Sequence, residues 1–340
     1  MPDEFKGGVT MKKPFPIACT ILAALSAATQ AFAFEPNRPV EFVVASGAGG
    51  GTDNFARTVQ SIITKYKLMD QSMVVLNKGG GSGAEAFLYA RQNKGDANKL
   101  YFGTNNAYLL PHVAKMAYST EDLTPVAALA FDEFLIWVKS DSPYGKPTDL
   151  VDAAKAKPGT VAFAGSQSKD TDETLVALIE QQTGASFKYV PFNGGGEVGV
   201  QLAGGHVAAN VNNPNENVGQ WQAGAVKPLC VFSSTQMAKS EPIHDGKGWQ
   251  DIPTCIEAGI PIESYKMPRT VWTAADVPED ALAYYTGVLR KVSETSEWKE
   301  YVRRTSQTGD FLTGKALGEF IATSETNAVK VFKTEGWLVQ

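Results

Sequence analysis

The chain has 340 residues, of which 43% are hydrophobic and 20% are charged, a composition typical of a folded globular protein large enough for two domains. Its formal net charge is −5, and no run of Lys or Arg exceeds two residues. Proteins that bind nucleic acids usually carry a basic patch, so we expect no nucleic-acid partner.

Residues 1–33 differ from the rest and have the pattern of a secretory signal peptide. Met11-Lys12-Lys13 form a short basic segment, residues 14–29 are mostly apolar, and Ala31-Phe32-Ala33 fits a signal-peptidase site. We therefore expect export with cleavage near Ala33, and Met11 is an alternative start. A membrane anchor is disfavoured because proline and polar residues interrupt the apolar segment.

Cleavage would leave two cysteines, Cys230 and Cys255. It would also leave a net charge of −6, since three basic and two acidic residues lie in the leader. In an oxidising compartment these cysteines form either a disulfide or two buried free thiols, and the residue pattern leaves both alternatives open. No later segment resembles a membrane span, so we expect a soluble mature protein.

Strand and helix signals alternate along the first half of the mature chain. Apolar, β-branched segments predict strands, and apolar residues at helical spacing predict helices between them. Alternation of this kind indicates βαβ units and a mostly parallel sheet with right-handed crossovers. The predicted strands are residues 39–45, 73–77 and 100–103, and the predicted helices are residues 54–66 and 84–92.

The same alternation restarts after residue 125. A long strand-like segment, residues 126–139, comes first, and a turn at residues 146–150 opens a helix. The last third of the chain is predicted to be helical, because apolar side chains within residues 282–292 share one face. We expect these helices to pack on the first sheet. Further predicted strands are residues 160–164, 187–192 and 207–211.

A glycine-rich loop, residues 43–57 (VVASGAGGGTDNFAR), joins the first strand to the first helix. It fails the dinucleotide pattern G-x-G-x-x-G, whose last position falls on Thr52 or Asn54, and it lacks the lysine of a P-loop. Its backbone N–H groups at a helix start still form a site for negative charge, with a hydroxyl donor from Ser46. Asp53 is expected to cap the helix or brace the loop. The alternatives are that it pairs with a ligand ammonium, or that the loop is a tight turn without a ligand.

Small polar residues also follow the other predicted strands. Ligands of open α/β sheets lie beyond the carboxyl ends of the strands, so we expect these loops to converge on one site. A turn requirement explains glycine at any one position, but it does not explain so many hydrogen-bonding groups at ends that should meet. The predicted ligand-binding residues are Ser46, Gly47, Ala48, Gly49, Gly50, Gly51, Thr52, Asp53, Thr104, Asn105, Gly165, Ser166, Asn193, Gly194, Gly195, Asn212 and Asn213.

Catalytic and metal-binding patterns are missing from the sequence. It contains no H-E-x-x-H, C-x-x-C or G-x-S-x-G motif, and no acidic pair suited to acid–base catalysis. His112, His206 and His244 are far apart in the sequence, and none has an obvious acid or nucleophile partner. We predict a binding protein rather than an enzyme, with no metal and no cofactor.

Several of these segments, taken in order, resemble the periplasmic substrate-binding proteins of tripartite tricarboxylate transporters, the TctC or Bug family. The similar segments are residues 48–57, residues 74–83 (VVLNKGGGSG), residues 192–213 (FNGGGEVGVQLAGGHVAANVNN) and residues 251–259. The resemblance covers nearly the whole mature chain. It implies an α/β, two-lobed, type II-like periplasmic binding protein, a hinged Venus flytrap in which each lobe is a mostly parallel sheet flanked by helices.

The resemblance also implies lobe boundaries and a function. Lobe 1 would comprise residues 34–134 and 262–340, and lobe 2 would comprise residues 135–261. The protein would be a monomeric periplasmic receptor that closes on a small organic acid, a di- or tricarboxylate or a related acid. It would hold the carboxylate through backbone amides and ordered waters at residues 46–53 and deliver it to membrane permease subunits.

Two segments depart from the family's pattern. Residues 169–173 (KDTDE) stand where the family often has a histidine, and Met267-Pro268-Arg269 stands where it often has tryptophan. Arg269 is expected either to hold a second ligand carboxylate or to form a surface salt bridge. For the function, the alternatives are a secreted enzyme that acts on a carboxylated substrate and a ligand sensor for a signalling partner.

Overall fold

The computed structural model describes residue 7 and residues 34–339. The expected signal peptide, apart from Gly7, therefore lies outside the described residues.

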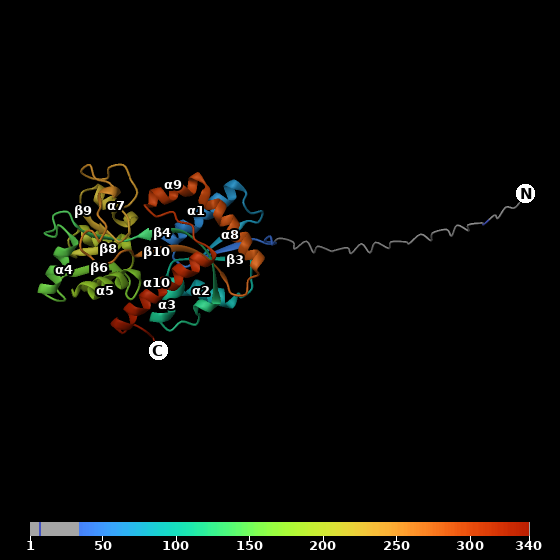
Figure 1. The fold of residues 1–340 in the computed structure, drawn as a ribbon, viewed down its shortest axis with the longest axis horizontal. Coiled ribbons are helices and arrows are strands. Elements are labelled where there is room, and N and C mark those ends of the chain that lie inside the picture. Colours follow the sequence, from blue (N-terminus) through green and yellow to red (C-terminus); the bar gives the residue numbers. More distant parts are fainter. Residues whose placement is uncertain (1–6, 8–33, 340) are drawn as a thin grey trace, which may run out of the picture. The chain divides into compact units, whose positions relative to one another are not determined.

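The described residues alternate strands and helices along most of their length (Figure 1). Two short 3-10 helices, η1 (Thr120–Asp122) and η2 (Trp249–Asp251), lie in connections. The strands are β1 (Val40–Val44), β2 (Met73–Asn77), β3 (Lys99–Gly103), β4 (Leu123–Glu133), β5 (Leu135–Lys139), β6 (Ala162–Ser166), β7 (Lys188–Phe192), β8 (Ala209–Asn212), β9 (Val226–Val231) and β10 (Lys266–Ala274). The helices are α1 (Gly51–Tyr66), α2 (Ala84–Gln92), α3 (Asn106–Val113), α4 (Pro147–Ala156), α5 (Thr171–Thr183), α6 (Gly195–Ala203), α7 (Pro214–Gln222), α8 (Glu279–Glu294), α9 (Ser296–Thr305) and α10 (Gly314–Glu335).

Sheet A has the strand order β2-β1-β3-β10-β4. β1 pairs in parallel with β2 and β3, because a helix connects each of these strands to the next and returns the chain to the same edge. β10 lies antiparallel between β3 and β4. Since β10 follows all the strands of sheet B in the chain, the chain returns to sheet A to complete it.

Sheet B has the strand order β7-β6-β8-β5-β9. β6 pairs in parallel with β7 and β8, whereas β5 is antiparallel to β8 and β9. The predicted α/β class with two helix-flanked sheets is confirmed. The expectation that each sheet is mostly parallel is wrong, because two of the four pairings in each sheet are antiparallel. The expected lobe boundaries at residues 134/135 and 261/262 stay a prediction.

Two of the predicted elements are wrong in detail. The segment 126–139 was expected to form one strand, but it divides at Phe134 into β4 of sheet A and β5 of sheet B. Both strands are almost entirely buried, so their apolar pattern continues across the change of sheet and does not reveal it. The last third was expected to be helical, but it also contains β10.

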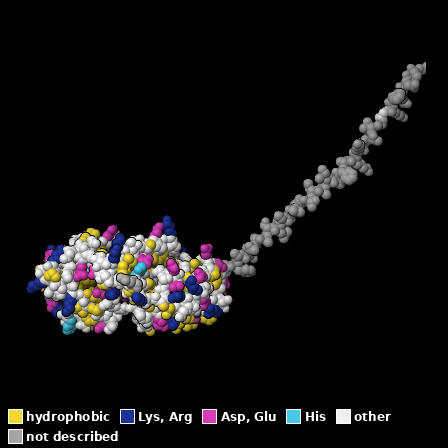
Figure 2. Space-filling model, turned by 90° about the horizontal axis from the view of Figure 1, so that it is seen from below, with side chains coloured by type: hydrophobic (Ala, Val, Ile, Leu, Met, Phe, Trp, Pro, Cys, Tyr) yellow, Lys and Arg dark blue, Asp and Glu magenta, His cyan; other side chains and the backbone are white. Residues whose placement is uncertain are grey.

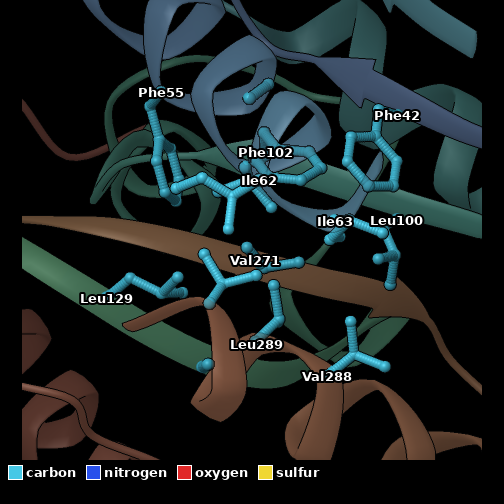
Figure 3. Packing of buried hydrophobic residues seen from close by; sticks show 14 of the residues in the cluster. Phe42, Phe55, Ile62, Ile63, Leu100, Phe102, Leu129, Val271, Val288 and Leu289 are labelled. Carbon is cyan, nitrogen blue, oxygen red and sulfur yellow. The ribbon is translucent and has the colours of Figure 1, made fainter. Parts of the chain in front are cut away.

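Helices cover both faces of sheet A and form two hydrophobic clusters with it. α1, α8 and α9 pack on one face, and α2, α3 and α10 pack on the other (Figure 1). Figure 3 shows the first cluster, in which Phe55 and Ile62 of α1 and Leu289 of α8 surround Phe102 and Val271 of the sheet. Burial of such side chains contributes roughly 1.5–3 kcal/mol each to folding. This packing supports the strand ends from which the candidate site extends.

Cys230 and Cys255 form a disulfide in the structure, which decides between the two alternatives that the sequence leaves open. Cys230 lies at the end of β9, and Cys255 follows 25 residues later in the segment that leads back to sheet A. Both residues are fully buried in the core of sheet B. The bond therefore attaches the returning segment to the edge strand β9.

The surface carries charges of both signs. On the face in Figure 2, acidic and basic side chains are interspersed instead of gathering by sign. Among the helices of the described residues, none is long and apolar enough to cross a membrane.

Candidate functional site

The glycine-rich loop forms a strand–loop–helix unit in which β1 ends at Val44 and α1 begins at Gly51. Gly47, Ala48 and Gly49 are exposed at the tip of the loop, whereas Thr52 and Asp53 are buried at the start of the helix. Gly49 has φ +79°, a conformation that glycine adopts without strain. The loop therefore exposes its backbone while its base is fixed in the protein.

Asp53 braces this loop from beneath. Its Oδ2 accepts a hydrogen bond of 2.8 Å from the backbone N–H of Gly49, and its carboxylate pairs with Arg57 at 2.9 Å. Asn77, at the end of β2, donates a third bond of 2.9 Å. Burial acts to raise the pKa of Asp53, but the bonds from Arg57, Gly49 and Asn77 outweigh it and hold the pKa below its ordinary value. The bracing prediction is confirmed, and the capping alternative is wrong because Gly50 is the N-cap.

The first turn of α1 keeps hydrogen-bond donors available. The backbone N–H groups of Gly51, Thr52 and Asp53 have no acceptor among the described residues, as expected at a helix start whose N-cap is a glycine without a side chain. The hydroxyl of Ser46 donates only to the neighbouring carbonyl of Gly47, at a long 3.3 Å. Free amides at a helix N-terminus favour an anion.

Arg269 of β10 brings a guanidinium group to the same helix start. Its Nη1 donates to Thr52 Oγ1 at 3.2 Å, and a Cβ atom on Gly51 would lie 2.9 Å from its Nη2. Arg269 is buried and pairs with Asp132 of β4 at 2.6 Å, although the two groups are not aligned as a hydrogen bond. The surface salt-bridge alternative for Arg269 is therefore wrong.

Two predicted loops of sheet B use their donors on nearby carboxylates. The N–H and hydroxyl of Ser166, which follows the buried Gly165, donate to Asp172 Oδ2 at 2.7 and 2.9 Å. The N–H and side-chain amide of Asn193 donate to Glu197 Oε2 at 3.2 and 3.3 Å. Burial, with the nearby charge of Glu216, raises the pKa of Asp172 well above its ordinary value.

A third carboxylate, that of Glu216, lies between the remaining predicted loops of sheet B. A Cβ atom on Gly195 would lie 2.1 Å from the carboxyl carbon of Glu216, so this group rests directly against the start of α6, where Gly194 is the N-cap. The backbone N–H of Asn213 donates to Glu216 Oε2 at 3.1 Å. Burial is the main cause that raises the pKa of Glu216 to about 7. Asn212 donates to the carbonyl of Gly195 at 2.8 Å, which joins the two loops.

Strand ends of the two sheets meet directly. Asn105, after β3 and Thr104, accepts a hydrogen bond of 3.0 Å from Thr171 of α5. Ser82, after β2, donates to Gln167, after β6, at 2.7 Å. The charges of Arg269 and Glu216 also interact across the two sheets. The predicted loops 46–53, 104–105, 165–166, 193–195 and 212–213 thus belong to two sets of strand ends that adjoin one another.

Three carboxylates at these strand ends were not among the predicted site residues. Asp172, Glu197 and Glu216 follow Ser166, Asn193 and Asn213 by three to six residues, and each accepts from one of them. The spacing Asn213-Pro-x-Glu216 is a capping-box signal that could have identified Glu216. The other two pairings depend on how each loop folds back onto its helix.

The expectation that no histidine has an acid partner is wrong for His112. His112 of α3 has an acid partner, because its Nε2 lies 2.7 Å from Glu325 Oε1 of α10, far away in the sequence. Within residues 34–339, no group of three or more His, Cys, Asp or Glu side chains could hold a metal ion.

A separate cavity of about 200 Å³ lies among α3, α5 and α10. Asn105 and Leu109 line it from α3 and its cap, Thr174 from α5, and Phe320 and Ser324 from α10. Of the predicted ligand-binding residues, Asn105 lines this cavity, whereas the loop 46–53 does not.

The sequence is similar to one protein family and to individual members of related proteins. The chain matches the model of the family described as tripartite tricarboxylate transporter family receptor over residues 55–308. It is 27% identical over 248 residues to the protein BugT of Bordetella pertussis (strain Tohama I), and the match covers 72% of each chain.

Two solved structures have the same fold as this chain. Rpa4515 of R. palustris with adipate superposes with a TM-score of 0.74 at 24% identity, covering 88% of this chain and 98% of that one. MatC from Rhodopseudomonas palustris with bound malate superposes with a TM-score of 0.70 at 20% identity, covering 87% and 99%. At these identities the likeness shows the fold alone.

Proposed function

The chain belongs to the tripartite tricarboxylate transporter receptor family, as its residue pattern predicts, and we propose that it captures a small organic carboxylate in the periplasm for a membrane permease. Membership in a family of receptors confirms the prediction of a binding protein rather than an enzyme. Capture of a solute requires a site that holds the ligand without transforming it.

The single observation that carries this proposal is the set of free donors at the start of α1. The amides of Gly51 and Thr52 have no acceptor among the described residues, and the guanidinium of Arg269 lies beside them. These groups supply positive potential where the loop is exposed, so the acidic net charge of the chain does not oppose an anionic ligand. The structural relatives named with adipate and malate bind carboxylates, which supports the same ligand class here.

Hinge closure is the mechanism that we propose. The strand ends of sheets A and B adjoin through Ser82 and Gln167 and through Asn105 and Thr171, so a ligand on the loop 46–52 would contact both sheets. Such a ligand stabilises the closed arrangement by the difference between its affinities for the closed and open states. The lobes would be residues 34–134 with 262–340, and residues 135–261.

The proposed function also implies where the protein acts and with which partners. Residues 1–33 would direct export and be removed near Ala33, and the mature protein would act as a monomer. Its partners would be the ligand and the permease subunits, and it would need no cofactor.

A thermal-shift screen of the mature protein tests the ligand class. We expect one or more organic carboxylates to raise the melting temperature in proportion to the logarithm of concentration above Kd, because the ligand binds the folded state. Neutral sugars should have no effect. A shift with a sugar and none with any carboxylate would contradict the proposal.

Gly50→Asp tests the location of the site. The backbone of Gly50 has φ −71°, which any residue can adopt, and an added Cβ atom would come no closer than 3.2 Å to its neighbours. The loop should therefore still fold, but a carboxylate at this position would repel an anionic ligand. We expect carboxylate binding to be lost while the circular dichroism spectrum is unchanged. Gly318→Asp is the matched control, since it lies exposed on α10 with open space around it. Equal affinities of the two variants would place the site elsewhere.

A further inference from the structure

The cavity among α3, α5 and α10 is separate from the loop proposed to hold the carboxylate, because the loop 46–53 does not line it. Its walls come from helices of both sheets. Leu109 of α3 and Ala328 of α10 belong to a hydrophobic cluster on sheet A, whereas Leu178 of α5 packs against the core of sheet B. A molecule in this cavity would therefore contact both sheets at a position of its own.

The cavity has the size of a small ring compound and is open to solvent. Its volume of about 200 Å³ exceeds the roughly 150 Å³ of an engineered apolar cavity that binds benzene. The apolar lining residues are Leu109, Leu178, Phe320, Ala328 and Val331. Exposed residues at the mouth are Ser264, Thr323 and Asn327. A six-membered ring could thus enter from solvent and be enclosed by apolar side chains.

Asn105 provides this cavity with an unused hydrogen-bond donor. The residue is only 3% exposed, and its Oδ1 accepts a hydrogen bond of 3.0 Å from Thr171. Its Nδ2 has no acceptor among the described residues, yet this atom is not completely enclosed by protein, so it faces open space. An amide N–H in a buried position is stabilised by an acceptor, which a ligand in the cavity would supply.

The charges around the cavity favour a neutral ligand. Of the described residues that line it, Lys266 alone is charged, and its ammonium is paired with Glu133 at 3.0 Å. An anion here would compete with Glu133 for that ammonium and would lose its hydration among apolar side chains. A neutral molecule incurs neither cost.

From these features we propose that the cavity is a second binding site, which takes one small neutral molecule with a ring-sized apolar body and a polar end that accepts a hydrogen bond from Asn105. A phenol has this chemistry. Because α3 and α10 pack on sheet A and α5 packs on sheet B, the bound molecule stabilises the arrangement in which the two sheets adjoin. The site itself stands without the proposed function, whereas its effect on closure rests on that function.

Ligand-observed fluorine NMR of the mature protein tests the ligand class. The probes 4-fluorophenol and 4-fluorotoluene have the same number of non-hydrogen atoms and differ in the polar end. We expect saturable binding of 4-fluorophenol with Kd on the order of 1 mM, as for a ligand of this size. 4-Fluorotoluene should bind about fivefold more weakly, equivalent to one neutral hydrogen bond. Equal affinities would overturn the role of the Asn105 amide.

Two variants that fill the cavity test its position. Leu178→Trp places a larger side chain inside it, and Thr323→Trp does so at the exposed mouth, where folding is not at risk. Each should weaken 4-fluorophenol binding by about tenfold or more, because a filled cavity leaves no room for the ring. Ile256→Trp is the matched control, since Ile256 is exposed and does not line the cavity. Unchanged binding in Thr323→Trp and in folded Leu178→Trp would overturn the site.

4-Fluorobenzoate distinguishes this site from the proposed carboxylate site. Any binding of this anion to the loop 46–52 should persist in Leu178→Trp and be lost in Gly50→Asp, whereas 4-fluorophenol should show the reverse. If 4-fluorobenzoate occupies the cavity more tightly than 4-fluorophenol does, the neutral ligand class is wrong. If no carboxylate binds to the protein but 4-fluorophenol does, the proposed function fails and this site stands.

Small-angle scattering tests the effect on closure. We expect saturating 4-fluorophenol to reduce the radius of gyration of the protein without carboxylate, because a ligand that contacts both sheets favours the closed state. The same addition should leave the radius of gyration of Leu178→Trp unchanged. Saturable binding of 4-fluorophenol without any change in the parent protein would overturn the effect on closure.

Discussion

At the scale of single residues, the candidate site depends on which carboxylates are used inside the protein. Asp53 uses its carboxylate to fix the loop, so the helix start behind it stays free of an internal anion. The carboxylate of Glu216, by contrast, lies directly against the start of α6. The starts of α1 and α6 are both rich in glycine and both leave backbone N–H groups without an acceptor among the described residues, but only that of α6 has the Glu216 carboxyl against it.

Removal of the Asp53 charge should loosen the loop. In Asp53→Asn the charge-assisted bonds from Gly49 and Arg57 are lost, and we expect carboxylate affinity to fall with a loss of about 1–3 kcal/mol in stability. Because the pKa of Asp53 is lowered in the folded state, its stabilisation is present above the ordinary value of 3.8 and is lost as the pH falls below it. Urea unfolding and calorimetry measure both effects, with Asp152→Asn, exposed on α4, as the control. Unchanged affinity would show that the loop does not need its brace.

Glu216 should make stability depend on pH in the opposite direction. Its pKa is raised from 4.5 to about 7, so the folded protein holds this proton more tightly than the unfolded chain does, and stability falls as the pH rises from 4.5 to about 7. The groups that face it are Asp132, Asp172 and Arg269. We expect Glu216→Gln to be more stable than the parent protein by about 1–3 kcal/mol at pH 8, and by much less at pH 5. Urea unfolding at both values measures this, and an equal difference at pH 5 and pH 8 would contradict it.

At the scale of elements, each sheet is completed by a segment that lies far along the sequence from the strand it joins. β10 inserts between β3 and β4, and the segment around Cys255 bonds to β9 through Val231 and Pro253. Such returning segments have few local interactions to hold them, so long-range bonds determine their position. The Cys230–Cys255 disulfide is the covalent example.

Loss of the disulfide should lower stability without removing the site. It closes a loop of 25 residues, for which constraint of the unfolded chain predicts a contribution of about 3.5 kcal/mol. The variant Cys230→Ala with Cys255→Ala should unfold at lower urea concentration and retain carboxylate binding. Reductant should destabilise the parent protein and leave the double variant unaffected. A parent protein that is insensitive to reductant would contradict the prediction.

At the scale of the whole molecule, the proposed function depends on two sets of strand ends that belong to different sheets. Single hydrogen bonds such as Ser82 to Gln167 join them, while the cores of the sheets are separate hydrophobic clusters. Two separate cores joined by a limited set of contacts are suited to a movement that opens and closes.

Loss of the Ser82–Gln167 contact should favour the open arrangement. In Ser82→Ala with Gln167→Ala, we expect a larger radius of gyration without ligand and affinity for the carboxylate weaker by about fivefold, equivalent to one neutral hydrogen bond. Small-angle scattering and calorimetry measure these quantities. Ser293→Ala, whose hydroxyl bonds within its own helix, is the control. An unchanged radius of gyration together with weaker binding would show that the contact acts on the ligand and not on closure.

The sequence by itself determined the alternation of strands and helices, the glycine-rich loop, the absence of nucleotide fingerprints and the resemblance to a receptor family. These features are local or ordered along the chain, so spacing and residue type reveal them. Tertiary structure alone decided that residues 126–139 serve two sheets and that Arg269 lies beside Thr52. It also decided that the donors of Ser166 and Asn213 are already engaged by Asp172 and Glu216. Whether a donor is free depends on distances between groups that only the folded backbone sets, and for that reason the engagement of these donors could not be read from the chain.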